Sequence, residues 1–225
     1  MSKSSATLIS ILVVDDQPIV RAGLRMLIEH HSDLILVGEA GTRSEALAAA
    51  GTRRPDIILL ELALAHESGL DFLGDLLNVA PESRVVILTG VRDPEAHRRA
   101  VHLGAMGLVL KDQAAEVVVK AIEKVHNGEV WLDRTLTASV LSERSREDRD
   151  PLGDLARIAS LTERERQIVE LVCQGLRNKQ IAEKLFISAA TVRNHLTSVL
   201  SKLELSNRVE LALYAYRQHL ARPPG

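Results

Sequence analysis

The first half of the chain alternates short apolar runs with longer segments in which apolar residues recur at helical spacing. The run at 8–14 is rich in branched residues and too short for a helix, so it predicts a strand buried on both faces. Four later runs share this character, and the predicted strands are 8–14, 35–39, 56–60, 84–88 and 107–110. The predicted helices are 18–29, 44–50, 70–79, 94–103 and 114–127.

This alternation predicts an α/β domain built on a doubly wound, five-stranded parallel sheet. Parallel neighbours need crossover connections, and these are right-handed, which places helices on both faces of the sheet. In such sheets the working site lies at the carboxyl ends of the strands. Residues that follow the strands directly are therefore the first candidates for function.

The C-terminal part of the chain shows only helix signals and predicts an all-α domain. Thr162 and Glu165 have capping-box spacing ahead of an apolar run, and Gly175 ends that first helix. With Asn178 and Ser188 as expected caps, the next helices are predicted at 178–185, 188–202 and 207–219. A short helix, a tight turn and a longer helix with exposed polar residues make up the helix-turn-helix plan, in which the second element enters the major groove of DNA.

The length and the composition along the chain indicate two small domains joined by a linker. The chain has 225 residues, and domains commonly hold roughly 100 to 200. Segment 142–151, SERSREDRDP, has charged residues of both signs and no aliphatic residue, which is typical of a linker, and 132–141 before it is expected to add a short helix. The predicted division is a first domain at 1–131, a linker at 132–157 and a second domain at 158–225.

Cysteine usage and hydropathy exclude two classes of protein. Cys173 is the single cysteine, which excludes an intramolecular disulfide and a secreted disulfide scaffold. No run approaches the roughly 20 apolar residues that span a bilayer. The N-terminal stretch has no apolar run long enough for a signal peptide before Asp15 and Asp16 interrupt it. We therefore expect a cytoplasmic protein with no membrane partner.

Charge is unevenly distributed between the two predicted domains. The net charge is −2, yet 160–225 has an excess of basic residues and 1–159 an excess of acidic ones. Affinity for nucleic acid comes largely from neutralising phosphate charge, so the basic C-terminal part favours a nucleic-acid partner. A solvated helix face is the alternative explanation of the same charges.

The third helix of the C-terminal domain has one apolar face and one hydrogen-bonding face. Val192, Leu196 and Val199 recur at core spacing, which turns Arg193, Asn194, Thr197 and Ser201 away from the core. Arg can bond bidentately to guanine and Asn to adenine, and each pair discriminates by roughly 1 to 3 kcal/mol. A solvated face is again the alternative for any one of these residues.

Residues 161–220 resemble the LuxR-type helix-turn-helix domain over its whole length. The resemblance is carried by LTERE, QGLRNKQIAEKLFIS, TVRNHL, LSKLEL and NRVELA. It implies double-stranded DNA as partner and a homodimer formed through the last helix. The implied base-facing residues are Arg193, Asn194 and Thr197, although several relatives carry a basic residue where Thr197 stands. The implied phosphate-side residues are Lys179, Thr191, His195, Lys202, Asn207 and Arg208. The implied core or dimerisation residues are Val209, Leu211, Ala212 and Tyr216.

A cluster of polar residues follows the strands of the first domain. Asp15 and Asp16 follow the first strand, Glu61 ends the third, Thr89 the fourth and Lys111 the fifth, so all five are expected at the carboxyl edge of the sheet. Adjacent carboxylates repel each other unless a cation or a lysine compensates. The cluster therefore predicts either a Mg²⁺ site, with Asp15, Asp16 and Glu61 as candidate ligands, or an ion-pair network. No cofactor is certain from this pattern.

Segments ILVVDDQP, DIILLELALAHESGL, VVILTG and GAMGLVLKD occur in this order, and residues 8–128 resemble the receiver domain of two-component response regulators. With the C-terminal domain, the whole chain resembles the NarL/FixJ class. The resemblance implies a flavodoxin-like fold and a histidine kinase or other regulatory protein as partner. It places Glu61 where the family has the aspartate that accepts a phosphoryl group. Asp15 and Asp16 match the metal-binding acids, Thr89 the switch hydroxyl, and Lys111 the lysine that pairs with the phosphoryl group.

Three departures from the receiver pattern affect the expected mechanism. Glu61 replaces the acceptor aspartate, Ala65 the usual proline of the next loop, and Leu108 the usual aromatic switch residue. The extra methylene of glutamate moves the carboxylate by about 1.5 Å, and small misplacements at a reacting centre can cost on the order of 100-fold. Efficient phosphoryl acceptance at Glu61 is therefore not expected. Its charge is only part of the roughly −1.5 to −2 of a phosphoryl group, so mimicry should be incomplete.

Three modes of control follow from these departures. In the first, Glu61 holds the receiver in an active-like state, and the protein dimerises and binds DNA without a kinase. In the second, Glu61 and Lys111 form a structural ion pair, and control passes to a small ligand or a partner protein; the loss of the aromatic ring at Leu108 favours this mode. In the third, Glu61 or a nearby group accepts phosphate after all.

Functions of other classes fit the sequence less well. A small phosphotransferase or hydrolase would share the clustered Asp, Thr and Lys, but the chain has no Gly-rich phosphate loop, nucleophile elbow or Cys/His metal spacing. The chain is therefore expected not to be an enzyme. Its few aromatic residues disfavour a flavin-binding domain. A pure interaction protein that never touches DNA remains as the last alternative.

Overall fold

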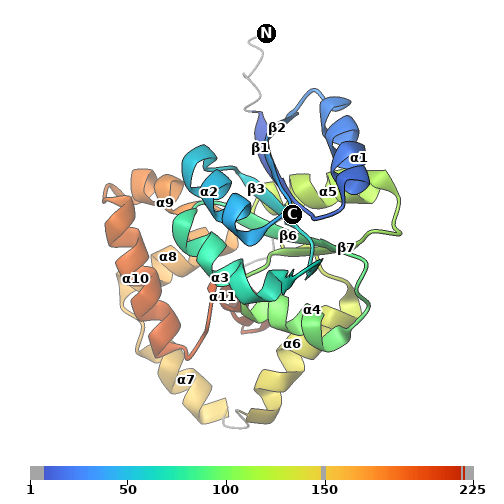
Figure 1. Ribbon diagram of the computed structural model, residues 1–225. Coiled ribbons are helices and arrows are strands. Elements are labelled where there is room, and N and C mark those ends of the chain that lie inside the picture. The colour runs from blue at the N-terminus through green and yellow to red at the C-terminus, as the bar shows by residue number, and fades with distance from the viewer. Residues whose placement is uncertain (1–7, 148–150, 219, 221–225) are drawn as a thin grey trace.

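The computed structural model describes residues 8–147, 151–218 and 220, and its N-terminal half is built on a five-stranded parallel sheet (Figure 1). The strand order is β2-β1-β3-β6-β7, with parallel pairing between all neighbours. The strands are β1 (Ile9–Val14), β2 (Leu34–Ala40), β3 (Ile57–Leu60), β6 (Arg84–Thr89) and β7 (Gly107–Leu110). The expected α/β doubly wound fold is confirmed, and each strand lies within two residues of its predicted bounds.

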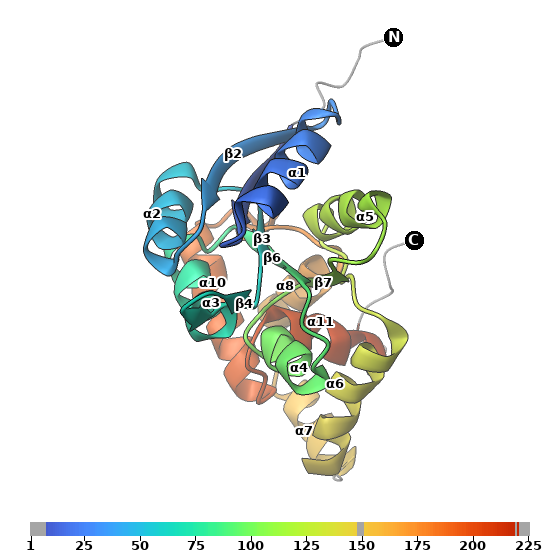
Figure 2. The same ribbon diagram turned by 45° about the vertical axis from the view of Figure 1, so that its right-hand side comes forward.

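Helices cover both faces of this sheet, as the alternating pattern predicts. The helices are α1 (Pro18–Glu29), α2 (Arg43–Arg53), α3 (Gly69–Val79), α4 (Pro94–His102) and α5 (Ala115–His126). Helices α1 and α5 pack on one face and α2 and α3 on the other, which gives two apolar cores (Figures 1 and 2). Helix α4 contacts α3, α6 and α11, so it faces the rest of the chain.

A small hairpin between β3 and α3 is a feature that the sequence did not predict. Strands β4 (Ala63–Leu64) and β5 (Glu67–Ser68) pair antiparallel directly after the carboxyl end of β3. The chain then passes close to its own backbone at Gly69, where a Cβ atom would lie 2.4 Å from the carbonyl oxygen of Glu61. Glycine is therefore required at this position, because only a residue without Cβ permits such an approach.

The segment expected to be a linker is largely helical. Helix α6 spans Arg134–Glu147 and α7 spans Pro151–Ala159, while residues 148–150 lie outside the described residues. Leu136 and Val140 of α6 pack into the receiver core, and the later Arg and Glu residues have good helix propensity. The charged residues of this segment suggested a linker, but the packing of Leu136 and Val140 at the start of α6 allows the helix to continue into it. Figure 1 shows α6 and α7 as two consecutive helices that connect the halves of the molecule.

The C-terminal part forms the predicted helical domain around its own apolar core. Its helices are α8 (Glu163–Cys173), α9 (Asn178–Leu185), α10 (Ala189–Lys202) and α11 (Arg208–Arg217). The capping box at Thr162 and Glu165 and the cap at Ser188 are confirmed. The expected cap at Asn178 is wrong, since Arg177 holds the N-cap position and Asn178 is the first, buried helical residue. The last helix ends near Arg217, and residue 219 lies outside the described residues.

Helix α11 joins the two halves through packing. Leu211, Tyr214 and Ala215 belong to the core of the C-terminal domain. Val209 and Leu213, on the same helix, belong instead to the core that includes β1, α1 and α5. One helix therefore contributes to two domains, and the molecule adopts a closed arrangement.

Candidate functional site

The polar residues that follow the strands meet in one buried pocket at the carboxyl edge of the sheet. The Lys111 Nζ atom lies 2.6 Å from Asp15 Oδ2 and 2.6 Å from Glu61 Oε2. The other Glu61 oxygen, Oε1, accepts hydrogen bonds from the Thr89 hydroxyl and, at 2.9 Å, from the Ala63 amide. Asp15 is 1% exposed, Glu61 3% and Thr89 0%. Both oxygens of Glu61 are thus engaged and shielded from solvent.

The pocket is held as a charged network. Burial by itself would raise the pKa of the Glu61 carboxyl, but hydrogen bonds from Lys111, Thr89 and the Ala63 amide outweigh it and lower the pKa. Burial would likewise lower the pKa of Lys111, and its contacts with Asp15 and Glu61 raise it instead. Glutamate and lysine therefore both stay ionised near neutral pH.

The candidate Mg²⁺ ligands are not assembled as a metal site. Lys111 stands between Asp15 and Glu61 as their cation, and the buried Asp16 Oδ1 has no hydrogen-bond partner. In the part of the chain that the structure describes, no group of three or more His, Cys, Asp or Glu side chains is arranged to hold a metal ion. Of the two arrangements expected for this cluster, the geometry shows the ion-pair network, and the Mg²⁺ site stays a prediction.

The two other positions that depart from the receiver pattern are Leu108 on β7 and Ala65 between β4 and β5. Leu108 is partly buried and packs against both cores of the domain, and its amide donates to the Trp131 carbonyl at 2.9 Å. Ala65 is exposed between β4 and β5. The Leu108 side chain thus packs in the apolar layer and offers no aromatic ring that could rotate.

Helix α10 presents a hydrogen-bonding face to solvent. Val192, Leu196 and Val199 are buried in the domain core. The expected base-facing residues, which are Arg193, Asn194 and Thr197, are all exposed. Of the expected phosphate-side residues, Lys179 is exposed at the start of α9, Thr191 bonds to the Ser188 hydroxyl at 2.8 Å, and His195 is half-buried.

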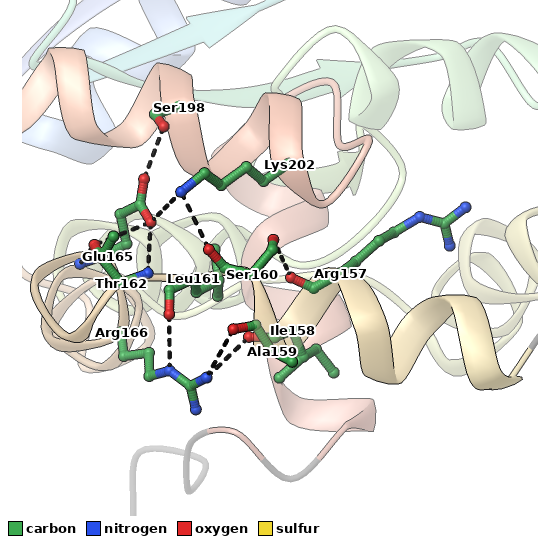
Figure 3. A network of polar contacts seen from close by, with 10 residues as sticks. All are labelled: Arg157, Ile158, Ala159, Ser160, Leu161, Thr162, Glu165, Arg166, Ser198 and Lys202. Atoms are coloured by element: carbon green, nitrogen blue, oxygen red, sulfur yellow. Dashed lines mark hydrogen bonds and ion pairs between the residues drawn. The ribbon is translucent and has the colours of Figure 1, made fainter.

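Lys202, also expected on the phosphate side, is engaged inside the domain (Figure 3). Its ammonium lies 2.7 Å from Glu165 Oε2 and donates to the Ser160 carbonyl at 3.2 Å. Glu165 also accepts from the Ser198 hydroxyl at 2.7 Å and from the Thr162 amide at 2.8 Å. Burial would raise the pKa of Glu165, but these donors lower it to about 2. The network ties α8 to α10 and so fixes the orientation of the recognition helix.

The remaining expected DNA and dimer residues contact either the first domain or other parts of their own domain. The Asn207 side-chain amide donates to the carbonyls of Val101 and His102, at 3.1 and 2.7 Å. Arg208 donates to Asn178 Oδ1 at 3.1 Å and to the Leu176 carbonyl. The expected dimerisation residues divide: Val209 packs in the receiver core, Leu211 in its own domain core, Ala212 is buried, and the Tyr216 hydroxyl donates to the Cys173 carbonyl at 2.7 Å.

Several polar contacts join the domains, and sequence reasoning did not identify them. The His102 Nδ1 atom of α4 lies 2.6 Å from Glu210 Oε1 of α11. Arg177 pairs with Asp56, which the Ser10 hydroxyl also contacts at 2.6 Å. The buried Arg84 donates to the Gly175 carbonyl at 2.5 Å. These residues are far apart in sequence, so no local spacing could have indicated the contacts.

Two glycines with positive φ let the backbones of the domains meet. Gly128 has φ 91° and Gly175 has φ 78°. A Cβ atom on Gly128 would lie 2.0 Å from the Gly175 Cα, and one on Gly175 would lie 2.2 Å from the Asn127 carbonyl oxygen. The positive φ values could have been anticipated from the glycines that end α5 and α8, but the contact between them depends on tertiary structure.

Comparison with known proteins identifies both halves of the chain. Residues 11–123 match the family described as response regulator receiver domain, and residues 159–215 match the bacterial regulatory proteins of the luxR family. The transcriptional activator DevR/DosR of Mycobacterium tuberculosis is 34% identical over 220 residues, covering 97% of this chain and 99% of the relative. The nitrate/nitrite regulator NarL of Escherichia coli is 34% identical over 215 residues, covering 94% and 96%.

Solved structures agree with the fold. A LuxR-family two-component response regulator from Aurantimonas is 29% identical, with a TM-score of 0.56, and covers 61% of this chain and 99% of its own. A structure described as two RcsB dimers bound to two parallel DNAs has a TM-score of 0.54 at 20% identity, covers 92% of this chain and 98% of its own, and bears on the fold alone.

The chain belongs to the response regulators that join a receiver domain to a LuxR-family DNA-binding domain. It is a DNA-binding transcription regulator related to NarL and DevR, and not an enzyme. Among the described residues, no helix is both long and apolar enough to cross a membrane.

Proposed function

We propose that this regulator acts in the cytoplasm, binds double-stranded DNA as a homodimer and is controlled without phosphoryl transfer to Glu61. Its receiver domain spans 1–131, its connecting segment 132–157 and its DNA-binding domain 158–225. A histidine kinase or other regulatory protein would act on this receiver through contact rather than by phosphorylating it. RcsB, whose dimers are described on DNA, offers a parallel for the bound assembly.

The observation that carries this proposal is the saturation of the Glu61 carboxylate. One oxygen pairs with Lys111 and the other accepts from Thr89 and the Ala63 amide, while the side chain is buried. Attack on a phosphoryl donor requires a free oxygen that can approach the donor in line. Freeing Glu61 would leave Lys111 with Asp15 as its one remaining ion-pair partner among the described residues and leave a buried carboxylate without its cation, which is costly.

The closed arrangement supports a regulator whose DNA binding depends on domain separation. Arg193 and Asn194 are exposed, but Asn207 bonds to carbonyls of the first domain and Val209 packs in the receiver core. Helix α11 therefore cannot keep these contacts and also pair with a second copy. In this mode the Glu61–Lys111 ion pair is structural, and a ligand or partner sets the balance between closed and open forms.

One hydrogen bond, between Thr89 and Glu61, favours a second mode of control. The Thr89 hydroxyl bonds to Glu61, as a switch hydroxyl would bond to a phosphoryl group, so Glu61 would act as a built-in activator. The modes differ in their response to Glu61→Gln, which keeps the shape of the side chain and removes the charge. Loss of DNA binding in Glu61→Gln would favour the activator mode, and equal binding would favour the structural pair.

The test combines phosphorylation with selection of DNA. Purified wild type, Glu61→Gln and Glu61→Asp are incubated with Mg²⁺ and acetyl phosphate, and the phosphorylated fraction is measured by intact mass. The same unphosphorylated proteins select fragments of genomic DNA at one fixed salt concentration, because phosphate contacts make affinity depend on ionic strength. We expect no phosphorylation of the wild type, gain of phosphorylation in Glu61→Asp, and enrichment of related half-sites without any phosphodonor. Phosphorylation of the wild type that disappears in Glu61→Gln would refute the proposal.

A further inference from the structure

A cavity of about 220 Å³ lies between the receiver and the DNA-binding domain. Both domains line it: Glu82 and Ser83 directly precede β6 and Arg84 is its first residue, while Arg177 caps α9 and Arg208 begins α11. Since a water molecule occupies roughly 30 Å³ in the liquid, this space can hold a small organic or inorganic ligand.

Positive charge exceeds negative charge around this cavity. Three arginines line it, and Glu82 is the one acidic residue among its described lining residues. Arg84 donates to the carbonyls of Val125, His126 and Gly175, which are neutral acceptors. Arg208 likewise bonds to neutral oxygens, and only Arg177 has an ion pair among the described residues, with Asp56.

One arginine of the lining has an unsatisfied hydrogen-bond donor. The Nη2 atom of Arg177 is buried and has no partner among the described residues. Burial lowers the pKa of Arg84 to about 9, with further lowering by the charges of Arg177 and Arg208. A buried donor without a partner and like charges held together are both unfavourable, unless an anion compensates them. The residues that line the cavity of the closed form thus favour a negative charge inside it.

We propose that this cavity is a binding site for a small multivalent oxyanion, such as phosphate, pyrophosphate or a phosphate ester. The planar fork of a guanidinium group matches the oxygens of a phosphoryl group, and such charge-assisted hydrogen bonds are about twice as strong as neutral ones. The ligand would bridge Arg177 and Arg208 of one domain and Arg84 of the other, and so stabilise the closed form.

The same site connects the ligand to DNA binding, an effect that rests on the proposed function. Asn207 and Arg208, expected to contact DNA phosphates, both line the cavity. An oxyanion held there occupies groups that DNA requires and keeps α11 against the receiver. The ligand and DNA should therefore exclude each other, and the oxyanion would act as an inhibitor of DNA binding.

Binding is tested first without DNA. The full chain is titrated with sodium pyrophosphate and with inorganic phosphate by calorimetry, against sodium chloride at the same ionic strength, and its thermal midpoint is recorded with each salt. We expect saturable binding of pyrophosphate and a higher midpoint than in chloride. If pyrophosphate bound no more than chloride does, the proposed site would be overturned.

Charge variants then test the residues of the cavity. Arg177→Met should weaken pyrophosphate binding on the order of tenfold, since it removes a charged hydrogen-bond donor. Glu82→Gln should strengthen binding several-fold, because it removes the acidic residue of the lining. Arg53→Met removes an exposed arginine elsewhere and should leave affinity unchanged. Equal weakening in Glu82→Gln and Arg177→Met would indicate mere opening of the interface and overturn the assignment.

The proposed effect of the oxyanion on DNA binding is tested by adding pyrophosphate to the complex of the protein with a selected DNA fragment at constant ionic strength. We expect weaker DNA binding by the wild type and little change in Arg177→Met. Pyrophosphate that binds the free chain but does not affect DNA affinity would overturn the effector role alone. A chain that binds pyrophosphate but no DNA under any condition would count against the proposed function and not against the site.

Discussion

The exposed face of α10 is where single side chains should decide which DNA sequence is bound. Its buried residues fix the rotation of the helix, so the positions between them project into solvent. Arg193 and Asn194 are exposed, and both side chains can bond bidentately to a base edge. Thr197 is different, because its hydroxyl already donates to the Arg193 carbonyl at 3.1 Å.

Arg193→Ala should weaken binding to a selected DNA site by about 10-fold to 100-fold, as expected from the loss of one bidentate base contact of roughly 1 to 3 kcal/mol. Binding to a scrambled site should change much less. The measurement is fluorescence anisotropy with both DNAs at one salt concentration, with Arg53→Ala as the control. Unchanged affinity and unchanged site preference in Arg193→Ala would refute the assigned role of α10.

Glu165 is the residue whose ionisation should matter most for the stability of the DNA-binding domain. Its pKa, lowered to about 2 in the folded chain, lies below the ordinary value of 4.5. The folded state therefore binds a proton less readily than the unfolded state, so the stabilisation is complete above the ordinary pKa and is lost as the pH falls toward 2. The network around Glu165 should thus weaken in acid.

Glu165→Gln should lower the free energy of unfolding by about 1–3 kcal/mol near neutral pH, because it weakens charged hydrogen bonds from Lys202, Ser198 and Thr162. The difference from wild type should shrink below about pH 4. Urea unfolding of the full chain, followed by circular dichroism at several pH values, measures this. The exposed Glu163→Gln, in the same helical turn, is the control, and a difference independent of pH would contradict the ionisation argument.

Among the secondary-structure elements, α4 and α11 hold the molecule closed. The two helices come from different domains and contact each other, and His102 meets the buried Glu210 at their crossing. Asn207 caps the start of α11 with its side-chain oxygen and bonds to the end of α4 with its amide group. Any change that separates these helices should free both the dimerisation face and the phosphate-side residues.

His102→Asp should open the molecule, since it places a second carboxylate against Glu210. Like charges at an interface cost several kcal/mol, so we expect a larger radius of gyration in solution scattering and DNA affinity higher on the order of tenfold. The exposed His66→Asp introduces the same charge elsewhere and should change neither quantity. An unchanged radius together with unchanged DNA affinity would show that this contact does not restrain the DNA-binding domain.

Secondary structure was predictable wherever a local pattern reflects burial. Strands β3 and β6 are apolar throughout and buried on both faces, and their runs indicated them directly. Helix α6 was missed beyond its first half because its later residues are charged, and their helical state follows from continuity with Leu136 and Val140. The β4–β5 hairpin is too short to leave a periodic pattern.

The whole molecule should exist as one copy in the free, closed state and as two copies on DNA. Val209 and Leu213 are buried against the receiver, so pairing through α11 requires opening first. We expect light scattering to give a monomer mass for the free chain. We expect two chains on DNA with a pair of half-sites, and much weaker binding to DNA with one. A single chain on the paired site would contradict dimeric recognition.

The sequence by itself determined the two domains, the order of strands and helices, and the set of polar residues at the carboxyl edge of the sheet. These features depend on periodicity, capping and the rule that parallel strands share an edge, all of which are local. Only the tertiary structure decided that Lys111 takes the place between Asp15 and Glu61, and that Arg84, Arg177 and Arg208 surround one cavity. Contacts between domains depend on shape and charge complementarity across distant segments, and no spacing along the chain encodes that geometry.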